Sequence, residues 1–342
     1  MATIKAWAVF KPNGELQPFE YELPPLGAEE VEVKVEYCGI CHTDLGFIAN
    51  EGANIIPIPY PLVPGHEITG TIVAMGPIAA QKGLSIGQKV GVGWMKSSCG
   101  HCDPCLNGEQ NLCINGQATI MGNYGGWAER VRVHWIWTIP LPEGLDIRDA
   151  GPLMCAGITV FAPLMELDIS PTSHIGVIGI GGLGHLALQF AAEWGAKVTA
   201  FTNNPAKTEE IKKLGASTVI AGNDAKEWDS LKGTFDLIIV TAAAHLDWDK
   251  IMQLLAPNGK LHILGILYEP IPISVIFLTL GQRSLSSSLV GSRGVMDKML
   301  RFAARHGIKP ITEHFPMSKV NEAIRKLESG KAAYRVVLDA DF

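Results

Sequence analysis

The stretch Ile175-Gly-Val-Ile-Gly-Ile-Gly-Gly-Leu-Gly184 joins a short apolar run to a glycine-rich turn. The apolar run is typical of a buried strand, and residues 183–194 after it have the pattern of a helix. Such a strand-turn-helix unit lets backbone N–H groups at the start of the helix bind a phosphate. The alternative is a turn that only packs the helix on a sheet. The candidate binding residues of the turn are Gly179, Gly181, Gly182, Leu183 and Gly184.

The pattern of residues along the chain changes at about residue 152. After it, short apolar runs alternate with helical patterns, which predicts an α/β fold with a doubly wound parallel sheet. Before it, Pro, Gly and short alternating runs predict an irregular β domain. We expect strands at residues 31–36, 68–74, 89–92, 128–133, 175–179, 197–201, 217–220, 235–240, 260–264 and 334–338. We expect helices at residues 183–194, 205–214, 247–255, 295–306 and 317–329.

Length and composition limit the class of protein. The chain has 342 residues, which is enough for about two domains. Its 47% hydrophobic and 18% charged residues exclude disorder through lack of apolar surface. The net charge of −6, without a run of Lys or Arg, disfavours a nucleic-acid partner. We see neither an apolar signal core nor an apolar run suited to a membrane span, and therefore expect a cytoplasmic protein.

Four of the seven cysteines are crowded into one segment, as Cys99-x2-Cys102-x2-Cys105-x7-Cys113. Four thiolates complete a tetrahedral site and leave no position for a substrate, so this loop predicts a structural zinc site. An iron–sulfur cluster is the alternative metal site. The odd cysteine count, without a signal peptide, disfavours a disulfide network.

Three further candidate ligands, Cys41, His66 and Cys155, are dispersed along the chain. Each alone is more often a packed thiol or a structural histidine, and we interpret Cys38 as a packed thiol in this way. Together, two cysteines and one histidine form a set that leaves a fourth zinc position for water or substrate. The sequence therefore raises the possibility of a catalytic zinc site beside the structural one.

The motifs around these residues occur in the order of a known family. They are Cys38-Gly-Ile-Cys-His-Thr-Asp-Leu45, Pro64-Gly-His-Glu67, the four-cysteine loop, Pro152-Leu-Met-Cys-Ala-Gly-Ile-Thr159, the glycine-rich turn and Tyr334-Arg-Val-Val-Leu338. Over nearly its whole length, the sequence resembles the zinc-dependent medium-chain dehydrogenases/reductases, most of all their cinnamyl-alcohol-dehydrogenase-like branch. This resemblance implies a GroES-like catalytic zinc domain at residues 1–152, completed by 293–342. It implies a Rossmann NADP-binding domain at residues 153–292.

The resemblance also implies roles for single residues. It implies that Cys41, His66 and Cys155 bind one catalytic zinc ion, with Asp44 and Glu67 as acidic residues near it, and that the four-cysteine loop binds one structural zinc ion. The remaining implied roles are the uptake of the alcohol proton by Thr43, pyrophosphate contacts by His42 and Arg335, and a nicotinamide contact by Thr159. As alternatives, Thr43 is only a helix cap and Arg335 only a surface residue of a strand.

The loop after the second predicted strand of the α/β region bears on the choice of cofactor. An NAD site normally has Asp or Glu about 20 residues after the first glycine. Here the loop contains Thr202, Asn203, Asn204 and Lys207, with no carboxylate before Glu209. Neutral donors and a lysine suit the dianionic 2′-phosphate of NADP(H), which we therefore predict. The alternative is an NAD-preferring protein in which Lys207 is a solvated helix residue.

The resemblance implies a zinc-dependent alcohol dehydrogenase or aldehyde reductase that acts on primary alcohols and aldehydes, aromatic or medium aliphatic, and forms a homodimer. Gly46 stands where many relatives have a histidine of the proton relay, so the proton route stays open. Candidate residues of the substrate pocket are Trp94 and, more weakly, Trp127, Ile276 and Phe277. A catalytically silent zinc protein that senses redox state is the alternative function. A zinc-free quinone-reductase relative is disfavoured because it should lack the dispersed ligand set.

Overall fold

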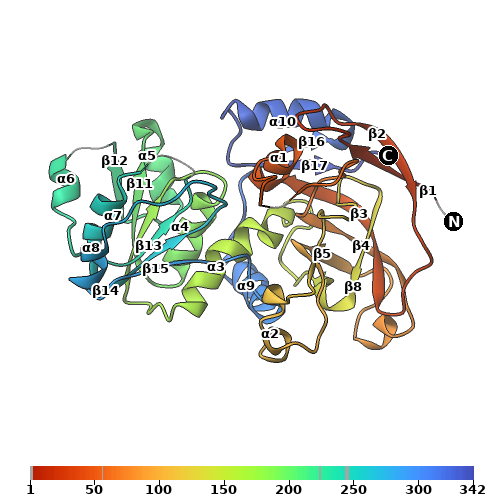
Figure 1. Cartoon of the computed structure of the whole chain (residues 1–342), viewed down its shortest axis with the longest axis horizontal. Coiled ribbons are helices and arrows are strands. Elements are labelled where there is room, and N and C mark those ends of the chain that lie inside the picture. The colour runs from red at the N-terminus through yellow and green to blue at the C-terminus, as the bar shows by residue number, and fades with distance from the viewer. Residues whose placement is uncertain (1–2, 56, 223–224, 243–245) are drawn as a thin grey trace. The chain divides into compact units, whose positions relative to one another are not determined.

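The computed structural model describes residues 3–55, 57–222, 225–242 and 246–342. Its internal contacts divide the chain into two compact units (Figure 1). Unit 1 consists of Met1–Ile158 and Val290–Phe342, and unit 2 consists of Thr159–Leu289. The C-terminal segment therefore returns to the unit in which the chain begins.

Unit 1 is built mainly from strands. They are β1 (Thr3–Ala8), β2 (Gln17–Glu22), β3 (Glu30–Ile40), β4 (Ile68–Met75), β5 (Lys89–Val92), β6 (Met95–Ser97), β7 (Gln117–Ala118), β8 (Arg130–His134), β9 (Ile139–Pro140), β16 (Thr312–Pro316) and β17 (Arg335–Asp339). Its α-helices are α1 (His42–Ala49), α2 (Asp103–Leu106), α9 (Arg293–His306) and α10 (Val320–Glu328). Its 3-10 turns are η1 (Ala79–Gln81), η2 (Gln110–Leu112), η3 (Trp135–Trp137), η4 (Gly151–Met154) and η6 (Met317–Lys319).

The main sheet of unit 1 has seven strands in the described residues, in the order β16-β17-β3-β4-β5-β9, with β8 also paired to β3. Strand β3 is central because it pairs with β17, β4 and β8. Val31, Val33 and Val35 of this strand are all buried in the core of the unit. The strand ends at Ile40, directly before Cys41, so a strand of the core fixes the position of that cysteine.

Unit 2 alternates strands and helices. The strands are β10 (His174–Ile178), β11 (Lys197–Thr202), β12 (Thr218–Ala221), β13 (Phe235–Val240), β14 (Leu255–Ile263) and β15 (Ser284–Ser287). The helices are α4 (Gly184–Glu193), η5 (Pro205–Lys207), α5 (Thr208–Lys213), α6 (Ala225–Asp229), α7 (Trp248–Leu254) and α8 (Val275–Thr279), and α3 (Ala156–Glu166) continues the chain from unit 1 into unit 2.

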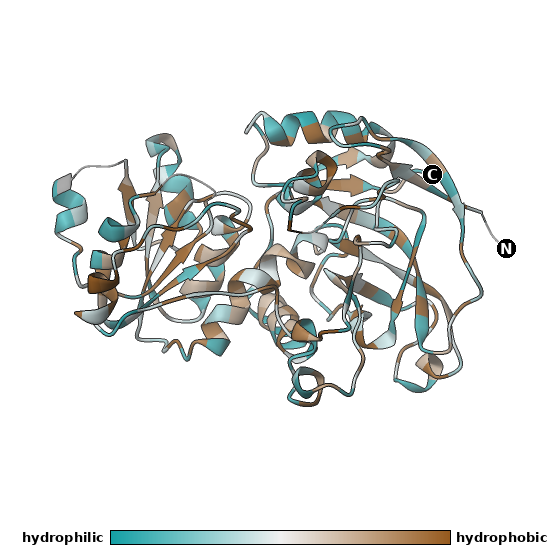
Figure 2. Cartoon of the chain, in the orientation of Figure 1, coloured by the Kyte–Doolittle hydropathy of each residue, from teal (hydrophilic) through white to brown (hydrophobic). Residues whose placement is uncertain are grey.

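The sheet of unit 2 is parallel throughout, in the order β12-β11-β10-β13-β14-β15. This order reverses beside β10, because the chain first adds strands on one side of β10 and then on the other. Ligands of such doubly wound sheets bind outside the carboxyl ends of the strands at this reversal. Apolar residues are concentrated on the strands, as Figure 2 shows, and the core includes Phe235, Ile238 and Leu261.

The predicted fold class, an irregular GroES-like β domain with a doubly wound Rossmann domain, is confirmed. The differences are local. The strand predicted at residues 128–133 begins at Arg130, and the helix predicted at 317–329 begins as a 3-10 turn and becomes α10 only at Val320. Strands β1, β2, β6, β7, β9, β15 and β16 and helices α1, α2, α3, α6 and α8 were not predicted. Short polar runs such as Ser284–Ser287 carry little apolar pattern.

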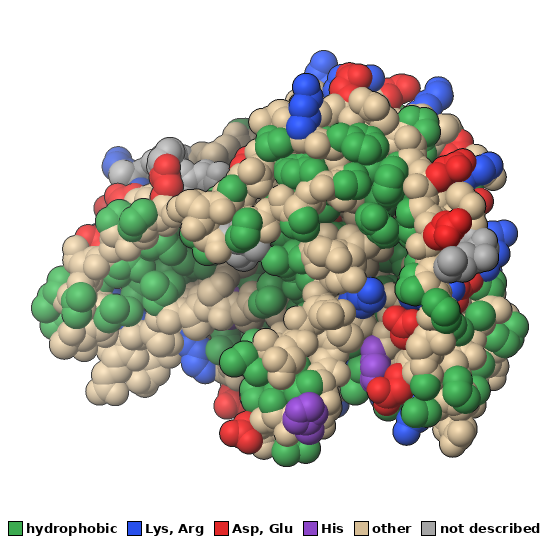
Figure 3. Space-filling model, turned by 45° about the vertical axis from the view of Figure 1, so that its right-hand side comes forward, with side chains coloured by type: hydrophobic (Ala, Val, Ile, Leu, Met, Phe, Trp, Pro, Cys, Tyr) green, Lys and Arg blue, Asp and Glu red, His purple; other side chains and the backbone are tan. Residues whose placement is uncertain are grey.

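Two further features concern partners. No helix in the described ranges is long and apolar enough to cross a bilayer. On the face drawn in Figure 3, Lys and Arg side chains are interspersed with Asp and Glu and do not gather into a basic stripe.

Candidate functional site

One buried carboxylate connects Cys41 to His66. Asp44, in the first turn of α1, is fully buried, and its Oδ2 accepts a hydrogen bond from the backbone N–H of Cys41 at 2.9 Å. Its Oδ1 accepts one from the backbone N–H of Gly65 at 2.9 Å and lies 3.0 Å from His66 Nδ1. Because Nδ1 is engaged by Asp44, Nε2 is the ring nitrogen of His66 that is left for another partner.

Two sulfur atoms and the imidazole of His66 then converge. Cys155 follows η4, and its Sγ lies 3.9 Å from Sγ of Cys41. These sulfurs, one nitrogen of His66 and one oxygen of Glu67 all lie within 4.8 Å of one another. In the described part of the chain, His66 Nε2 is buried without a hydrogen-bond partner, which is costly. Sulfur and nitrogen are the donors that tetrahedral zinc prefers, so these residues fit a zinc ion.

The charges at this group also favour a cation. The hydrogen bond with Cys155, followed by His66, lowers the pKa of the Cys41 thiol well below its ordinary value, although burial opposes this. Burial alone would lower the pKa of His66, but Asp44 and Cys41 raise it well above its ordinary value. The buried anionic groups therefore favour a positive charge beside them, which a divalent cation would supply.

An ion pair from the C-terminal strand completes the group. Arg335, the first residue of β17, pairs through Nη2 with Oε1 of Glu67, and both side chains are buried. Burial raises the pKa of Glu67 to about 7, although Arg335 opposes this rise. Gly39 makes the close packing of Glu67 possible, because a β carbon at position 39 would lie 2.0 Å from Glu67 Oε2. The guanidinium group of Arg335 thus balances the second acidic residue of the site.

The four-cysteine loop forms a second, separate group of donors. The sulfurs of Cys99, Cys102, Cys105 and Cys113 all lie within 4.8 Å of one another. Sγ of Cys102 is 3.8 Å from Sγ of Cys113, which also accepts a hydrogen bond from the backbone N–H of Cys99 at 3.2 Å. The backbone N–H of His101 lowers the pKa of Cys99 to about 6, which favours the thiolate. Four thiols without any other type of donor fit a closed zinc site.

In unit 2, the glycine-rich turn follows β10 at the reversal of the strand order. Gly179 has a φ of +90°, and a β carbon there would lie 2.7 Å from Cβ of Ala242. A β carbon at Gly184 would lie 2.0 Å from the carbonyl oxygen of Gly179, so this glycine lets α4 begin against the turn. At Gly181, by contrast, a β carbon would meet no described atom within 4 Å. Internal packing therefore does not explain that glycine, and its cofactor contact stays a prediction.

The loop after β11 carries the predicted cofactor-selecting residues. Oγ1 of Thr202 accepts a hydrogen bond from the backbone N–H of Asn204, and Oδ1 of Asn204 accepts one from that of Ala206, both at 3.1 Å. These two side chains therefore shape the turn. Asn203 is exposed beside them, and Lys207 ends η5. The roles of these four residues in the choice of cofactor stay predictions.

Comparisons with known proteins agree with this geometry. The alcohol dehydrogenase GroES-like domain family matches residues 27–143, and the zinc-binding dehydrogenase family matches residues 182–305. The chain is 48% identical over 335 residues to the aldehyde reductase AdhA of Synechocystis sp., and the match covers 98% of each protein. This chain belongs to the zinc-dependent medium-chain alcohol dehydrogenase family. It lies in the cinnamyl-alcohol-dehydrogenase-like branch.

Solved structures place this alcohol dehydrogenase in the same branch. A cinnamyl alcohol dehydrogenase from Sorghum bicolor is 33% identical, with a TM-score of 0.92, and the match covers 99% of this chain and 98% of that one. The Helicobacter pylori enzyme solved with NADP(H) is 28% identical, with a TM-score of 0.88 and coverage of 99% and 98%. The protein is thus an oxidoreductase of the alcohol dehydrogenase type.

The other predicted residues of this dehydrogenase differ in their exposure to solvent. His42 is exposed, and Thr43 and Thr159 are half-buried, so their assigned contacts stay predictions. The Trp94 ring meets the His66 ring edge-on, with 5.3 Å between centroids, which suits a wall beside the donor group. Trp127 is fully buried in the core of unit 1, so its place in a substrate pocket stays a prediction. In unit 2, Ile276 is 53% exposed and Phe277 is half-buried.

Sequence reasoning missed two features of the site. It did not predict that Arg335 pairs with Glu67, because 268 positions separate the two residues and no local pattern connects them. It also gave Glu51 no role. Gly46 is buried, and a β carbon there would lie 3.2 Å from Oε2 of Glu51, so an ionisable group faces the position that lacks a histidine.

Proposed function

We propose that this chain is a zinc-dependent alcohol dehydrogenase that uses NADP(H) and interconverts primary alcohols and aldehydes, aromatic or medium aliphatic. One observation carries the proposal: two sulfurs and an unpartnered imidazole nitrogen converge in the interior of unit 1. The chemistry of this donor set leaves a zinc position open for an oxygen ligand. The identity to an aldehyde reductase over nearly the full chain supports the activity.

In this proposal Cys41, His66 and Cys155 hold the catalytic zinc, and the four-cysteine loop holds a structural zinc. A bound zinc ion supplies Lewis acidity towards an alcohol or carbonyl oxygen, and a bound nicotinamide gives or takes the hydride. Asp44 fixes the ring of His66 through Nδ1, so that Nε2 serves as the ligand. The closed cysteine group takes no part in the reaction.

The chain's own polar groups would handle the proton and the surrounding charge. Thr43 stands two residues after Cys41, in the first turn of α1, and its hydroxyl group would accept the proton of the alcohol. Glu51 faces the space at Gly46 and is an ionisable group for the next transfer. Arg335 balances the buried charge of Glu67. The carboxylate that bonds the metal-binding histidine is that of Asp44.

The cofactor would bind at the carboxyl end of the sheet of unit 2. The glycine-rich turn and the N-terminus of α4, which no side chain caps in the described residues, would bind a pyrophosphate there. Gly181 leaves room for that group, and Asn203 and Lys207 would bind a 2′-phosphate. The NADP(H) in the Helicobacter pylori relative supports this choice. A homodimer and a cytoplasmic location stay part of the proposal.

A panel of aldehydes with NADPH and NADH, run beside metal analysis, tests the proposal. We expect two zinc ions per chain and a higher kcat/KM with NADPH than with NADH for an aromatic or medium aliphatic aldehyde. Zinc content without reduction of any aldehyde would instead favour a silent zinc protein. A higher kcat/KM with NADH would leave the alcohol dehydrogenase assignment but overturn the choice of cofactor.

A further inference from the structure

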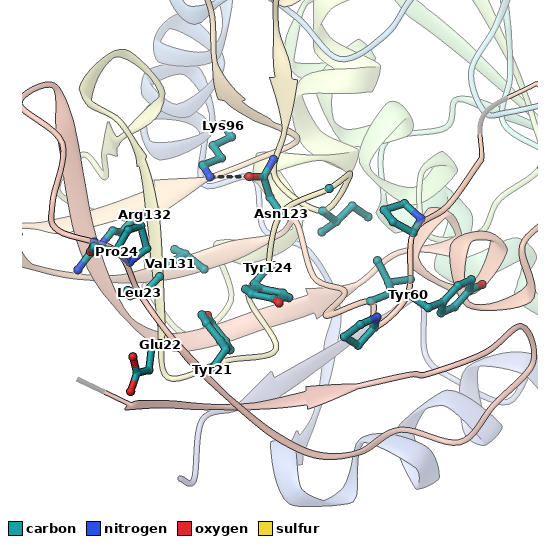
Figure 4. Close-up of a pocket in the computed structure, with 15 residues that line it drawn as sticks. Tyr21, Glu22, Leu23, Pro24, Tyr60, Lys96, Asn123, Tyr124, Val131 and Arg132 are labelled. Atoms are coloured by element: carbon teal, nitrogen blue, oxygen red, sulfur yellow. Dashed lines mark hydrogen bonds between the residues drawn. The ribbon is translucent and has the colours of Figure 1, made fainter. Parts of the chain in front are cut away.

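Unit 1 contains a cavity of about 440 Å³ that the dehydrogenase reaction does not use. Five stretches form it: residues 21–24 at the end of β2, residues 59–62, residues 120–124, strand β6 and strand β8 (Figure 4). A cavity of this size accommodates a small organic molecule. We propose that it binds a small planar aromatic carboxylate, at a site separate from the metal-binding residues.

Aromatic rings form one wall of this cavity. The rings of Tyr21 and Tyr124 lie 4.1 Å apart between centroids, and Phe19 packs against both, at 5.9 Å and 5.7 Å. The hydroxyl group of Tyr21 donates to the carbonyl oxygen of Arg130 at 3.3 Å, which fixes that ring. Tyr124 is 38% exposed and is therefore the ring that an incoming ligand can reach. Such a cluster suits a planar ring, because aromatic pairs add attraction beyond area burial.

The cavity also contains a cation that lacks a carboxylate partner. Nζ of Lys96, on β6, donates to Oδ1 of Asn123 at 2.6 Å, as Figure 4 shows. None of the ion pairs in the described residues includes Lys96, although it is half-buried. An ammonium group has three N–H donors, so Asn123 leaves donors for an anion. Glu30 acts on the charge of Lys96 without forming an ion pair with it, so this half-buried ammonium group can still gain a close counter-ion.

The other charged groups of the cavity are already engaged or distant. Arg132, on β8, pairs with Glu32, with 2.8 Å between Nε and Oε2, and its Nη1 donates to the carbonyl oxygen of Pro24. Glu22 lies at the opposite end of the drawn residues from Lys96 (Figure 4). The ammonium group of Lys96 and the ring of Tyr124 therefore define the two ends of a ligand, one anionic and one aromatic. This pair of features favours a carboxylate over a neutral ring or a bare anion.

A layer of apolar side chains separates this cavity from the metal-binding group. Leu62 and Ile120 line the cavity and belong to a buried apolar cluster. Trp94 packs against that cluster, and its ring also meets the ring of His66. The proposed ligand would thus lie on the far side of this layer from the donors. A compound that fills the open metal position should not displace it.

Fluorine NMR of 4-fluorobenzoate, titrated with the zinc-loaded full-length protein, tests the proposal. Imidazole is present throughout to fill an open metal position. We expect saturable binding of 4-fluorobenzoate. The amide 4-fluorobenzamide lacks the carboxylate, and acetate, added as a competitor of 4-fluorobenzoate, lacks the ring, so each should bind about tenfold more weakly. Lys96→Met should weaken the binding of 4-fluorobenzoate by about tenfold, and Tyr124→Leu should weaken it by a smaller factor. Lys11→Met, at an exposed lysine outside the cavity, should leave it unchanged.

Three results would overturn the proposal: no saturable binding, equal binding of the carboxylate and the amide, or equal affinity of Lys96→Met and the unaltered protein. Melting curves identify a variant that fails to fold. If Lys96→Met does so, the comparison of ligands on the unaltered protein and the Tyr124→Leu variant decide. Because the readout is binding and not turnover, its failure leaves the proposed dehydrogenase function untouched.

Discussion

The two donor groups of unit 1 are built in opposite ways. The four-cysteine group comes from a single segment, residues 99–113, and Cys99 and Cys102 in it are only half-buried. The other group combines residues 41, 66, 67 and 155, which come together only when the sheet has formed. It also has supporting partners: Asp44 beside the histidine and Arg335 beside Glu67. The first group is local and consists of thiols alone, whereas the second is dispersed, mostly buried, supported and mixed in its donor types.

This difference predicts different consequences when a ligand is lost. A local group of four thiolates can stabilise its loop but has no position for a substrate. A dispersed group with an open position can react, and its supporting carboxylates orient the ligands. Variants of the dispersed group should therefore lose activity first, and variants of the four-cysteine group should lose stability first.

The largest effect should follow from Cys155→Ser. The substitution removes one of the two sulfurs of the dispersed group, so zinc content should fall by one ion per chain. We expect kcat/KM for the aldehyde to drop by about a thousandfold or more. Metal analysis and steady-state kinetics check this, with the melting temperature as a control for folding. Full activity in a zinc-depleted Cys155→Ser protein would remove the dispersed group from the reaction.

Cys102→Ser should have the reverse profile. The loss of a thiolate from the closed group weakens a metal site whose binding energy is folding energy. We expect the unfolding free energy to fall by about 3 kcal/mol and the melting temperature to fall by roughly 6–12 °C. The folded fraction should keep a kcat within about twofold of the unaltered protein. An unchanged melting curve with unchanged zinc content would show that this group is not a structural metal site.

Asp44→Asn probes the support of the dispersed group. The amide is similar in size to the carboxylate but cannot hold the charge opposite His66 Nδ1. Loss of such a partner typically costs about 10- to 100-fold in metal affinity or activity. We expect a decrease in kcat/KM in this range while the four-cysteine zinc is retained. Equal zinc affinity and equal kcat/KM in both proteins would contradict a positioning role for Asp44.

These groups also show what sequence could predict. The four-cysteine spacing is local, so Cys99 to Cys113 could be read as one site directly. Cys41 and Cys155 could be joined to His66 only as a set of donor types and through the family resemblance. The pairing of Arg335 with Glu67 could not be predicted, because β3 brings the two residues together by pairing with β17 on one side and with β4, which follows Glu67, on the other. Long-range register decides such contacts, and no short motif encodes it.

The fold shows the same division. Strands with strong apolar runs, such as β10 and β13, were predicted almost residue by residue. The polar edge strand β15 was not predicted, because hydrogen bonds to β14 and not an apolar pattern make it a strand. Trp127 was a candidate pocket residue by residue type alone, whereas packing against the Gly65 turn puts it in the core.

Lys207→Ala extends the comparison to unit 2, which contains neither donor group. If Lys207 binds a 2′-phosphate, its loss should raise KM for NADPH by about tenfold and leave KM for NADH within twofold. Zinc content and kcat should be unaltered. Lys213→Ala, on α5, is the matched control at an exposed lysine. Equal changes in KM for both cofactors would show that Lys207 does not select between them.

The smallest effect is expected at the other end of β3, far along the strand from Cys41. Glu32 is buried and bonds Arg130 and Arg132 of β8 at 2.5 Å and 2.8 Å. Burial alone would raise the pKa of Glu32, but the two guanidinium groups outweigh it and lower the pKa below its ordinary value of 4.5. The stabilisation by Glu32 is therefore present above pH 4.5 and is lost as the pH falls below it.

Glu32→Gln keeps the shape of the side chain and removes the charge, so unfolding free energy at pH 7 should fall by about 1 kcal/mol, since Arg130 is partly screened by solvent. The difference between the two proteins should stay constant from pH 7 to 4.5 and shrink towards zero as the pH falls further, because protonated Glu32 no longer differs from Gln in charge. Urea denaturation at several pH values measures this difference. Zinc loss in acid affects both proteins equally and therefore cancels from it. Zinc content and kcat/KM at pH 7 should stay unchanged. A loss of activity without a loss of stability would mean that the charge of Glu32 acts on Cys41 along β3. The sheet and the metal-binding residues would then not be independent of each other.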